Sequence, residues 1–140
     1  MTWPCRGSFA AILCIIAFAG CGGPKFVPVK GTATYHGKPV PNLIINFTPS
    51  AGRPSSATTD EHGNFELVST DKTKGAAVGT HKVSVTPAPR DPIDEIRMAN
   101  GEPSLDPVRA AIFARFDNHE TSPLSVTITK AETNLELKLD

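Results

Sequence analysis

Three adjacent ionisable side chains, Asp60, Glu61 and His62, are the nearest approach to a metal-binding group in this sequence. Carboxylates and imidazoles are common ligands of divalent metal ions. Three consecutive residues rarely converge on one ion, however, and no second pair of ligands stands at a recognisable spacing. We therefore interpret Asp60 and Gly63 as structural residues of a tight turn, in which the aspartate accepts backbone N–H groups and the glycine takes a positive φ.

The other reactive side chains do not assemble into a catalytic motif. His36, His81 and His119 are scattered, without a metal-binding His-Glu-x-x-His pattern, and the Gly-x-Ser-x-Gly element of many hydrolases is absent. No cysteine follows Cys21, so the rest of the chain has no thiol for catalysis, metal binding or a disulfide. We expect no catalytic residue, no cofactor and no metal site, and we expect His81 at the rim of the fold with a partly buried ring.

The N-terminal segment has the pattern of a targeting signal. Residues 9–20 are apolar or small, and one basic residue, Arg6, precedes them. Twelve helical residues rise about 18 Å, which is too short for a hydrocarbon core of about 30 Å. This pattern predicts a secretory signal peptide over residues 1–20. Its end, Phe18-Ala19-Gly20-Cys21, resembles the bacterial lipobox, in which a peptidase cleaves before the cysteine and the thiol receives a diacylglycerol.

The lipobox resemblance implies a lipoprotein whose mature chain begins at a lipidated Cys21, with acyl chains such as palmitate holding it to the membrane. Each buried CH₂ of such chains adds about 0.8 kcal/mol of membrane affinity. We expect residues 21–26 to form a lipidated tether and residues 27–140 to form the domain. Gly22 stands where an aspartate would imply retention in the inner membrane, so the resemblance places the protein in the bacterial cell envelope, at the outer membrane.

The charge balance excludes some partners on composition alone. The 14 basic residues equal the 14 acidic ones, and removal of residues 1–20 takes away only Arg6, which leaves a net charge of −1. A neutral chain predicts no long-range field that would attract nucleic acid or an anionic membrane surface. The 39% hydrophobic and 20% charged residues are typical of one globular domain.

From Val27 onward, apolar residues alternate with polar ones, which is typical of half-buried strands. About seven short strands are expected, with a weak edge strand at Ser55–Thr59 and a hairpin loop over Ala131–Asn134. The apolar residues of the other runs are Val27, Val29, Ala33, Tyr35, Leu43, Ile45, Phe47, Phe65, Leu67, Val83, Val85, Leu124, Val126, Ile128, Leu135, Leu137 and Leu139. The pattern predicts an all-β fold, an antiparallel two-sheet sandwich of transthyretin- or immunoglobulin-like form.

Residues 88–115 interrupt this alternation. Asp91-Pro92 and Asp106-Pro107 each combine an N-cap aspartate with a proline at the first helical position, which predicts two short helices. We expect the second helix over Val108–Ala114 and extended chain over Ala114–Phe116. Connections of this length are usually functional or disordered. The segment is therefore expected to be an insertion that covers one end or edge of the sandwich, adds nothing to the core and supplies partner specificity.

Several short motifs in this order resemble the carboxypeptidase regulatory-like domain family, a transthyretin-like sandwich, and especially its bacterial lipoprotein members. The motifs cover residues 27–87 and 116–140: Val29-Lys30-Gly31, His36-Gly37-Lys38-Pro39-Val40, Thr59-Asp60-Glu61-His62-Gly63-Asn64-Phe65, Gly79-Thr80-His81-Lys82-Val83-Ser84-Val85 and Thr121-Ser122-Pro123-Leu124. The resemblance implies a non-enzymatic module with a structural or adhesive role, which binds envelope proteins through loops or an edge strand.

Two alternatives remain open. Related sandwiches include carbohydrate-binding modules, so a glycan or another small ligand is a possible partner, although residues 21–140 contain no Trp, one Tyr and five Phe. A hydrolase is the weaker alternative. Transthyretin-like hydroxyisourate hydrolases end in Tyr-Arg-Gly-Ser, whereas this chain ends in Leu137-Lys138-Leu139-Asp140. An exposed aromatic pair would favour the glycan, and a pocket of converging His, Arg and carboxylate groups would favour the enzyme.

Overall fold

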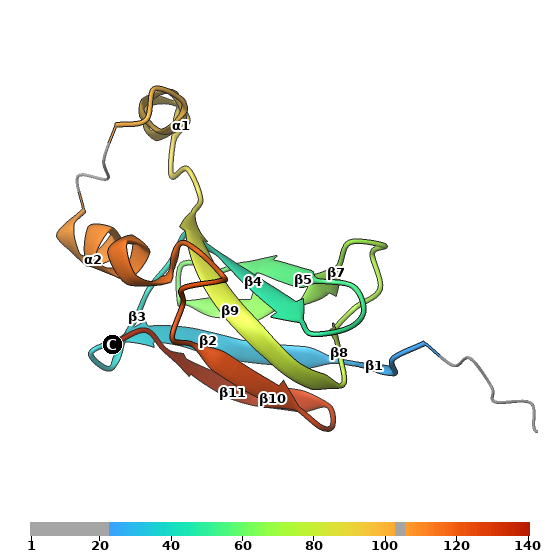
Figure 1. Cartoon of the computed structure of the whole chain (residues 1–140). Helices are drawn as coiled ribbons and strands as arrows, with labels where there is room; N and C mark the ends of the chain where they lie inside the picture. The colour runs from blue at the N-terminus through green and yellow to red at the C-terminus, as the bar shows by residue number, and fades with distance from the viewer. Residues whose placement is uncertain (1–22, 103–105) are drawn as a thin grey trace, which may run out of the picture.

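The computed structural model describes residues 23–102 and 106–140. Two β-sheets face one another, and both helices lie at one end of the sandwich, where the second helix packs on the strands and the first projects outward (Figure 1). The first sheet has the order β10-β9-β4-β5-β7, formed by Ser125–Ile128, Gly79–Pro87, Leu43–Pro49, Ser55–Thr58 and Val68–Ser69. The second has the order β11-β2-β3, formed by Glu132–Lys138, Val29–Tyr35 and Lys38–Pro39, and β6 (Asn64–Glu66) also pairs with β2. A two-stranded sheet joins β1 (Phe26–Val27) to β8 (Ala76–Ala77).

The apolar positions of the alternating segments form the core between the two sheets. In β4, Leu43, Ile45 and Phe47 are fully buried, and the last two pair with Val85 and Val83 of β9. The facing sheet contributes further buried side chains, among them Val29, Ala33, Phe65 and Leu137. Because successive side chains of a strand point to opposite faces, this alternation buries one face of each sheet. The predicted all-β sandwich is confirmed.

The last strand has a different partner from the expected one. A hairpin over residues 131–134 would pair β10 with β11, but β10 pairs with β9, and β11 pairs in parallel with β2. The chain therefore crosses from one sheet to the other at this point. Gly31 of β2 makes the pairing possible where β11 has a register shift, because a Cβ at Gly31 would lie 2.1 Å from the carbonyl oxygen of Leu135.

The connection through Asp60 and Gly63 also crosses between sheets. β5 belongs to the first sheet and β6 to the second, so this tight turn joins strands of different sheets and does not close a hairpin. β5 lies between β4 and the short β7, whereas an edge position was expected. Turn residues specify a sharp reversal of direction, and they carry no information about which sheet receives the next strand.

Both predicted helix starts are confirmed. Helix α1 spans Pro92–Ala99 with Asp91 as its N-cap, and helix α2 spans Pro107–Phe116 with Asp106 as its N-cap. The extended chain expected over residues 114–116 is wrong, since α2 continues to Phe116. Ile112 and Phe116, four residues apart, lie on one face of α2 and are both buried in the core. The expectation that residues 88–115 add nothing to the core is therefore wrong for α2.

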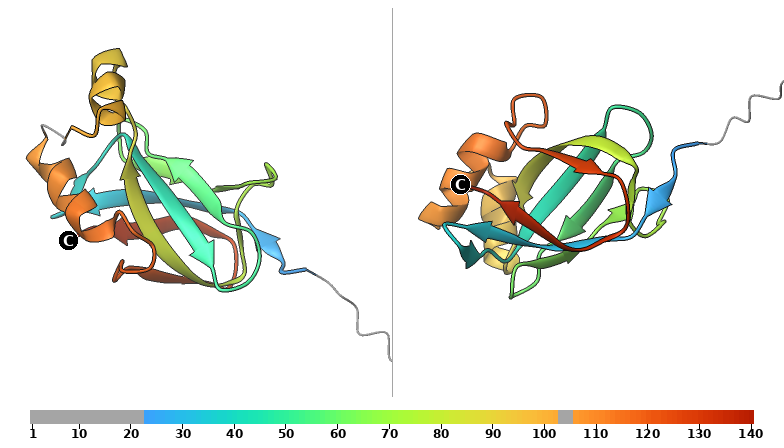
Figure 2. Two further views of the ribbon diagram at one scale, coloured as in Figure 1. Left: turned by 45° about the horizontal axis from the view of Figure 1, so that its top comes forward. Right: turned by 90° about the horizontal axis from the view of Figure 1, so that it is seen from below.

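The two ends of the sandwich differ in what they carry. β1 lies at one end, whereas α1, α2 and the C-terminus lie at the other (Figures 1 and 2). Phe26, expected in the tether, already pairs with Ala77, and the Val78 N–H donates to the Lys25 carbonyl at 2.8 Å. The predicted signal peptide over residues 1–20 and Cys21 lie outside the described residues. Within residues 23–102 and 106–140, no helix has the length and apolar character needed to cross a bilayer.

Candidate functional site at the helical end

The helices α1 and α2 form the most distinctive surface of the described chain. Helix α1 has no buried residue, and Ile93 and Ile96 on it are 71% and 62% exposed. A hollow of about 390 Å³ lies between the helices. Its apolar lining consists of Pro87, Met98, Ala110, Phe113 and Ala114, and its charged lining consists of Asp94, Arg97, Glu102, Arg109 and Asp117. A hollow lined by both apolar and charged side chains suits the binding of a partner better than it suits catalysis.

Arg109 connects α2 to the ends of two core strands. Its side chain is only 3% exposed. Nη2 donates to the carbonyl of Ala88, just after β9, at 2.6 Å, and to the carbonyl of Asn42, just before β4, at 3.2 Å. Nη1 donates to Oδ2 of Asp94 at 3.3 Å. A buried guanidinium requires such partners, because an unpaired charge away from water is strongly unfavourable.

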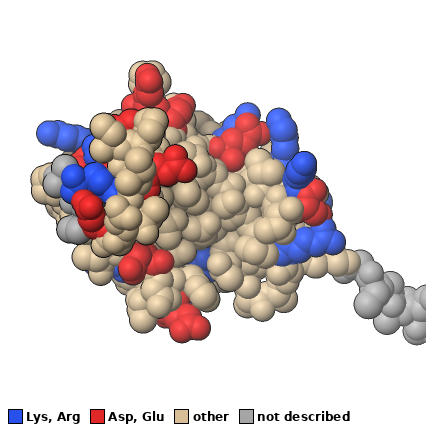
Figure 3. Space-filling model, turned by 90° about the horizontal axis from the view of Figure 1, so that it is seen from above, with Lys and Arg blue, Asp and Glu red and all other residues tan. Residues whose placement is uncertain are grey.

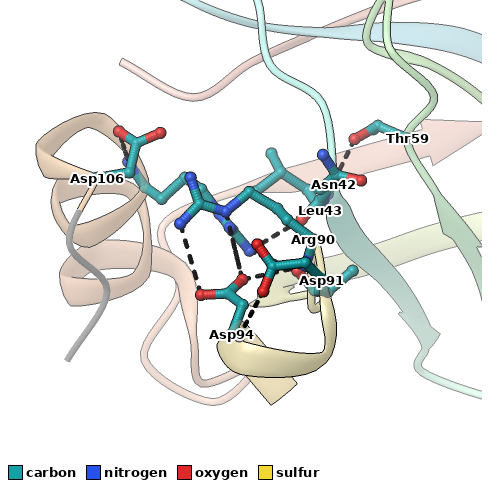
Figure 4. Close-up of polar contacts among 9 residues, drawn as sticks. Asn42, Leu43, Thr59, Arg90, Asp91, Asp94 and Asp106 are labelled. Atoms are coloured by element: carbon teal, nitrogen blue, oxygen red, sulfur yellow. Dashed lines mark hydrogen bonds and ion pairs between the residues drawn. The ribbon is translucent and has the colours of Figure 1, made fainter. Parts of the chain in front are cut away.

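Asp94 holds α1 against this guanidinium. Its Oδ2 also accepts from the backbone N–H of Arg90 at 3.1 Å and from Arg90 Nε at 3.3 Å (Figure 4). The side-chain hydrogen bond from Arg90 is the largest cause that holds the pKa of Asp94 below its ordinary value, and the same contact raises the pKa of Arg90. Asp94 is therefore an ionised anchor at neutral pH, with no proton to offer as a general acid.

The turn at Asp60 has the geometry expected for a structural role. Asp60 Oδ1 accepts from the backbone N–H of His62 at 2.8 Å and of Asn64 at 2.9 Å, and the bond from Asn64 is the largest cause that lowers the pKa of Asp60. Gly63 has a φ of 74°, as predicted. Among the described residues, no group of three His, Cys, Asp or Glu side chains is placed to hold a metal ion.

His81 differs from its expected place at the rim. The side chain is fully buried, its Nε2 lies 2.7 Å from the Ala77 carbonyl oxygen, and its ring centroid lies 5.7 Å from that of Phe47. The reason is its phase in β9, where it shares the inward face with Val83 and Val85. The other three histidines, His36, His62 and His119, are exposed on separate turns and loops.

A second hollow, of about 750 Å³, lies over β2, β6 and β11, and most of the residues that line it are polar. Some of these side chains pair with one another. Thr32 Oγ1 donates to Asn64 Oδ1 at 3.0 Å, and Lys30 Nζ lies 3.4 Å from Glu66 Oε2. The exposed large apolar side chains of the described residues are the aliphatic Val78, Ile93, Ile96 and Val108, whereas the ring of Tyr35, which lies 4.1 Å from the ring of the exposed His36, is half-buried.

Arg109 is the main residue of this site that the sequence analysis did not select. Its spacing indicates that it is buried, because Arg109 lies three residues before Ile112 and seven before Phe116, on the same helical face. An arginine on a buried helical face requires carbonyl or carboxylate partners nearby. The sequence alone does not show which strand ends supply them.

Comparisons with protein-family models, with curated proteins and with solved structures found no match to this chain.

Proposed function

We propose that this protein is a non-enzymatic, lipid-anchored module of the bacterial cell envelope that binds a partner protein through its helical end. The observation that carries the proposal is the exposure of Ile93 and Ile96 on α1, a helix that adds no residue to the core. Neither isoleucine is among the residues that line the hollow, but large aliphatic side chains with this exposure on one helix are typical of interaction surfaces.

The arrangement of the two ends supports an anchored role. The described chain begins at Gly23, two residues after Cys21, and enters the fold through β1 at the end opposite the helices (Figure 1). An acyl chain on Cys21 would therefore hold the β1 end at the membrane. The helical end would then face away from the bilayer, where another protein can reach it.

The ion pairs of Asp94 support binding with little rearrangement. Arg109 and Arg90 position α1 through its first turn, while Ile93 and Ile96 stay free of the core. A surface held in its binding conformation loses less conformational entropy when a partner binds. The charged residues Arg97, Glu102 and Asp117 line the same hollow and would contribute selectivity at its edge.

Site-specific crosslinking in the native envelope tests the proposal. A photoreactive amino acid at position 93 or 96 should give a discrete adduct with one protein, and Ile93→Ser combined with a photoreactive residue at 96 should weaken it. The matched control is a photoreactive residue at position 127, an exposed threonine of β10 that lies on the sandwich and not on a helix. Equal adducts from position 127 and from α1 would contradict a binding surface on α1.

Mass spectrometry of the N-terminal peptide tests the anchor separately. We expect a chain that begins at Cys21 and carries two or three acyl chains. An intact precursor with an unmodified thiol in the native host would contradict the lipid anchor. It would not affect the crosslinking test of the binding surface on α1.

A carbohydrate or small ligand is the second candidate, and the polar hollow over β2, β6 and β11 favours it. Thr58, Thr133, Asn134 and Glu136 supply hydroxyl, amide and carboxylate groups at this surface. Binding to a glycan array that is lost in Asn134→Ala would support this alternative. A hydrolase has the least support, since Asp94 and Arg109 are occupied by each other and by backbone groups.

A further inference from the structure

We propose that the β1 end of the sandwich is a basic surface that lies against an anionic lipid bilayer. Four segments meet at this end: residues 23–25, 50–54, 70–75 and 129–131. They carry five exposed basic side chains and one acidic side chain, and with the bordering Lys30, Glu66 and Glu132 the net charge of this end is +3. The basic residues are Lys25, Arg53, Lys72, Lys74 and Lys130, and we call them the basic end.

Backbone contacts bring the four segments together. The Val78 N–H donates to the Lys25 carbonyl at 2.8 Å, and the Thr70 N–H donates to the Pro54 carbonyl at 3.3 Å. Arg53 pairs with Asp71, and Lys74 Nζ lies 3.6 Å from Glu66 Oε1 of β6. The connection from β10 to β11 lies at the same end, because Ile128 pairs with Gly79 and the Glu132 N–H donates to the Pro28 carbonyl at 2.9 Å. Figure 3 shows Lys and Arg gathered around the point where the described chain begins.

The opposite end has the opposite charge. Residues 36–42, 59–63, 88–102, 106–117 and Asp140 carry nine acidic and five basic side chains, a net charge of −4. The nine residues of β9 connect the two ends, which corresponds to about 30 Å at 3.3 Å per residue. At physiological salt the Debye length is about 8 Å, so a bilayer at the basic end is screened from the acidic end.

This separation corrects what composition alone predicted. A net charge near zero implies no field toward an anionic membrane only if the two signs are mixed over the surface. Here the fold sorts them along the long axis of the sandwich. Lysines suit phospholipid headgroups because each is a compact charge on a flexible stem that can reach a phosphate. Val78, 37% exposed at the same end, adds an aliphatic contact to the headgroup region.

The basic end would act together with the proposed anchor but does not depend on it. Each basic residue close to an anionic leaflet strengthens binding about fivefold. Contact at this end also gives the domain one orientation, with α1 and α2 directed away from the bilayer. Acyl chains on Cys21 would keep the β1 end near the bilayer, and contact of the basic end would in addition fix the tilt of the domain.

Vesicle sedimentation with a chain that begins at Gly22 tests the proposal. This chain lacks Cys21, and it keeps every core residue, because the core lies between Val27 and Leu139. We expect it to bind vesicles of phosphatidylglycerol and phosphatidylcholine at low salt, and not vesicles of phosphatidylcholine alone. Binding should disappear at about 1 M salt, where the Debye length is about 3 Å.

Two triple variants locate the surface. Lys25→Gln with Lys72→Gln and Lys74→Gln should weaken binding on the order of 100-fold. The matched control, Lys38→Gln with Arg115→Gln and Lys138→Gln, removes the same charge at the other end and should change binding less than about threefold. Equal weakening in both variants, or no binding to the anionic vesicles by the unaltered chain, would overturn the proposal. Acylation plays no part in this test, so its result is independent of the proposed anchor.

Discussion

Arg109 Nη1 lies 3.3 Å from Asp94 Oδ2, and this contact joins a helix that belongs to the core to one that does not. The two side chains are 3% and 11% exposed. Helix α2 packs Ile112 and Phe116 into the core, whereas α1 has no buried residue. The position of α1 therefore depends on a few charged contacts and on its connections along the chain, more than on apolar packing.

Replacement of Arg109 by methionine should destabilise the domain by about 2–4 kcal/mol. The substitution leaves the buried Ala88 carbonyl without its guanidinium donor, which costs about 1–3 kcal/mol, whereas the Asn42 carbonyl keeps the Ala88 N–H as a donor at 3.1 Å. Urea unfolding measures the change. Arg97→Met is the control, because its ion pair with Glu102 is partly exposed and so screened by water, and it should stay within about 0.5 kcal/mol. Equal effects of the two substitutions would contradict the role of Arg109.

The acid sensitivity of the fold should depend in part on Asp94. Arg90 holds the pKa of Asp94 below its ordinary value in the folded state. Stability from this source is fully present above the unfolded value of about 3.9, and it is lost as the pH falls through the lower folded pKa. Asp94→Asn should therefore be less stable at neutral pH and should lose less stability than the unaltered chain below about pH 4.

Melting temperatures measured between about pH 2 and pH 7 give this comparison. Asp60 and Glu66 have lowered pKa values as well, so Asp94→Asn should still lose stability at low pH, but less than the unaltered chain. If the melting temperatures of the two chains fell equally as the pH was lowered, the role of Asp94 in the acid sensitivity of the fold would be contradicted.

Two isoleucines on neighbouring helices should differ sharply when truncated. Ile112 is fully buried and Ile96 is 62% exposed. Ile112→Ala should cost about 2–5 kcal/mol, because it removes buried apolar surface and leaves a cavity. Ile96→Ala should stay within about 0.5 kcal/mol. Denaturant midpoints measure the loss of stability in each variant, and similar losses at the two sites would mean that α1 is part of the core.

The same reasoning separates the two halves of the segment between β9 and β10. Replacement of residues 91–102 by a short Gly/Ser link should leave a folded domain, since α1 buries none of its residues. Replacement of residues 107–116 should abolish cooperative unfolding, because it removes Arg109, Ile112 and Phe116 together. Circular dichroism melting curves distinguish these outcomes. A folded protein without α2 would restore the view that the whole segment lies outside the core.

Gly63 and Gly37 form a matched pair for backbone strain. Their φ values are 74° and 76°, but a Cβ at Gly63 would lie 2.9 Å from the Ala33 carbonyl oxygen, whereas nothing lies within 4 Å at Gly37. Gly37→Ala should cost about 1 kcal/mol through the positive φ alone. Gly63→Ala should cost more, because the backbone of β2 must also move. Thermal unfolding of both variants gives the difference, and equal losses would mean that space around Gly63 is unimportant.

Local features of the sequence determined the strands, the helix starts and the inward faces. Alternation through Leu43, Ile45 and Phe47 follows from the geometry of a single strand, and Asp-Pro steps satisfy free N–H groups within one helical turn. Such patterns act over a few neighbouring residues, and one chain is therefore enough to recognise them. The turn at Asp60 and Gly63 belongs to this class, since its hydrogen bonds close within five residues.

Tertiary structure decided the partners of these elements. The alternation of Leu135 and Leu137 requires a core face, and both β10 and β2 would offer one, so the parallel pairing with β2 rests on contacts about 100 residues apart in the chain. Arg109 is buried because the strand ends at Asn42 and Ala88 meet α2 there. The separation of charge likewise arises only when Lys25, Lys74 and Lys130 come to one end. The order of these groups along the chain does not give their distances in three dimensions, and those distances set the packing and the electrostatic field.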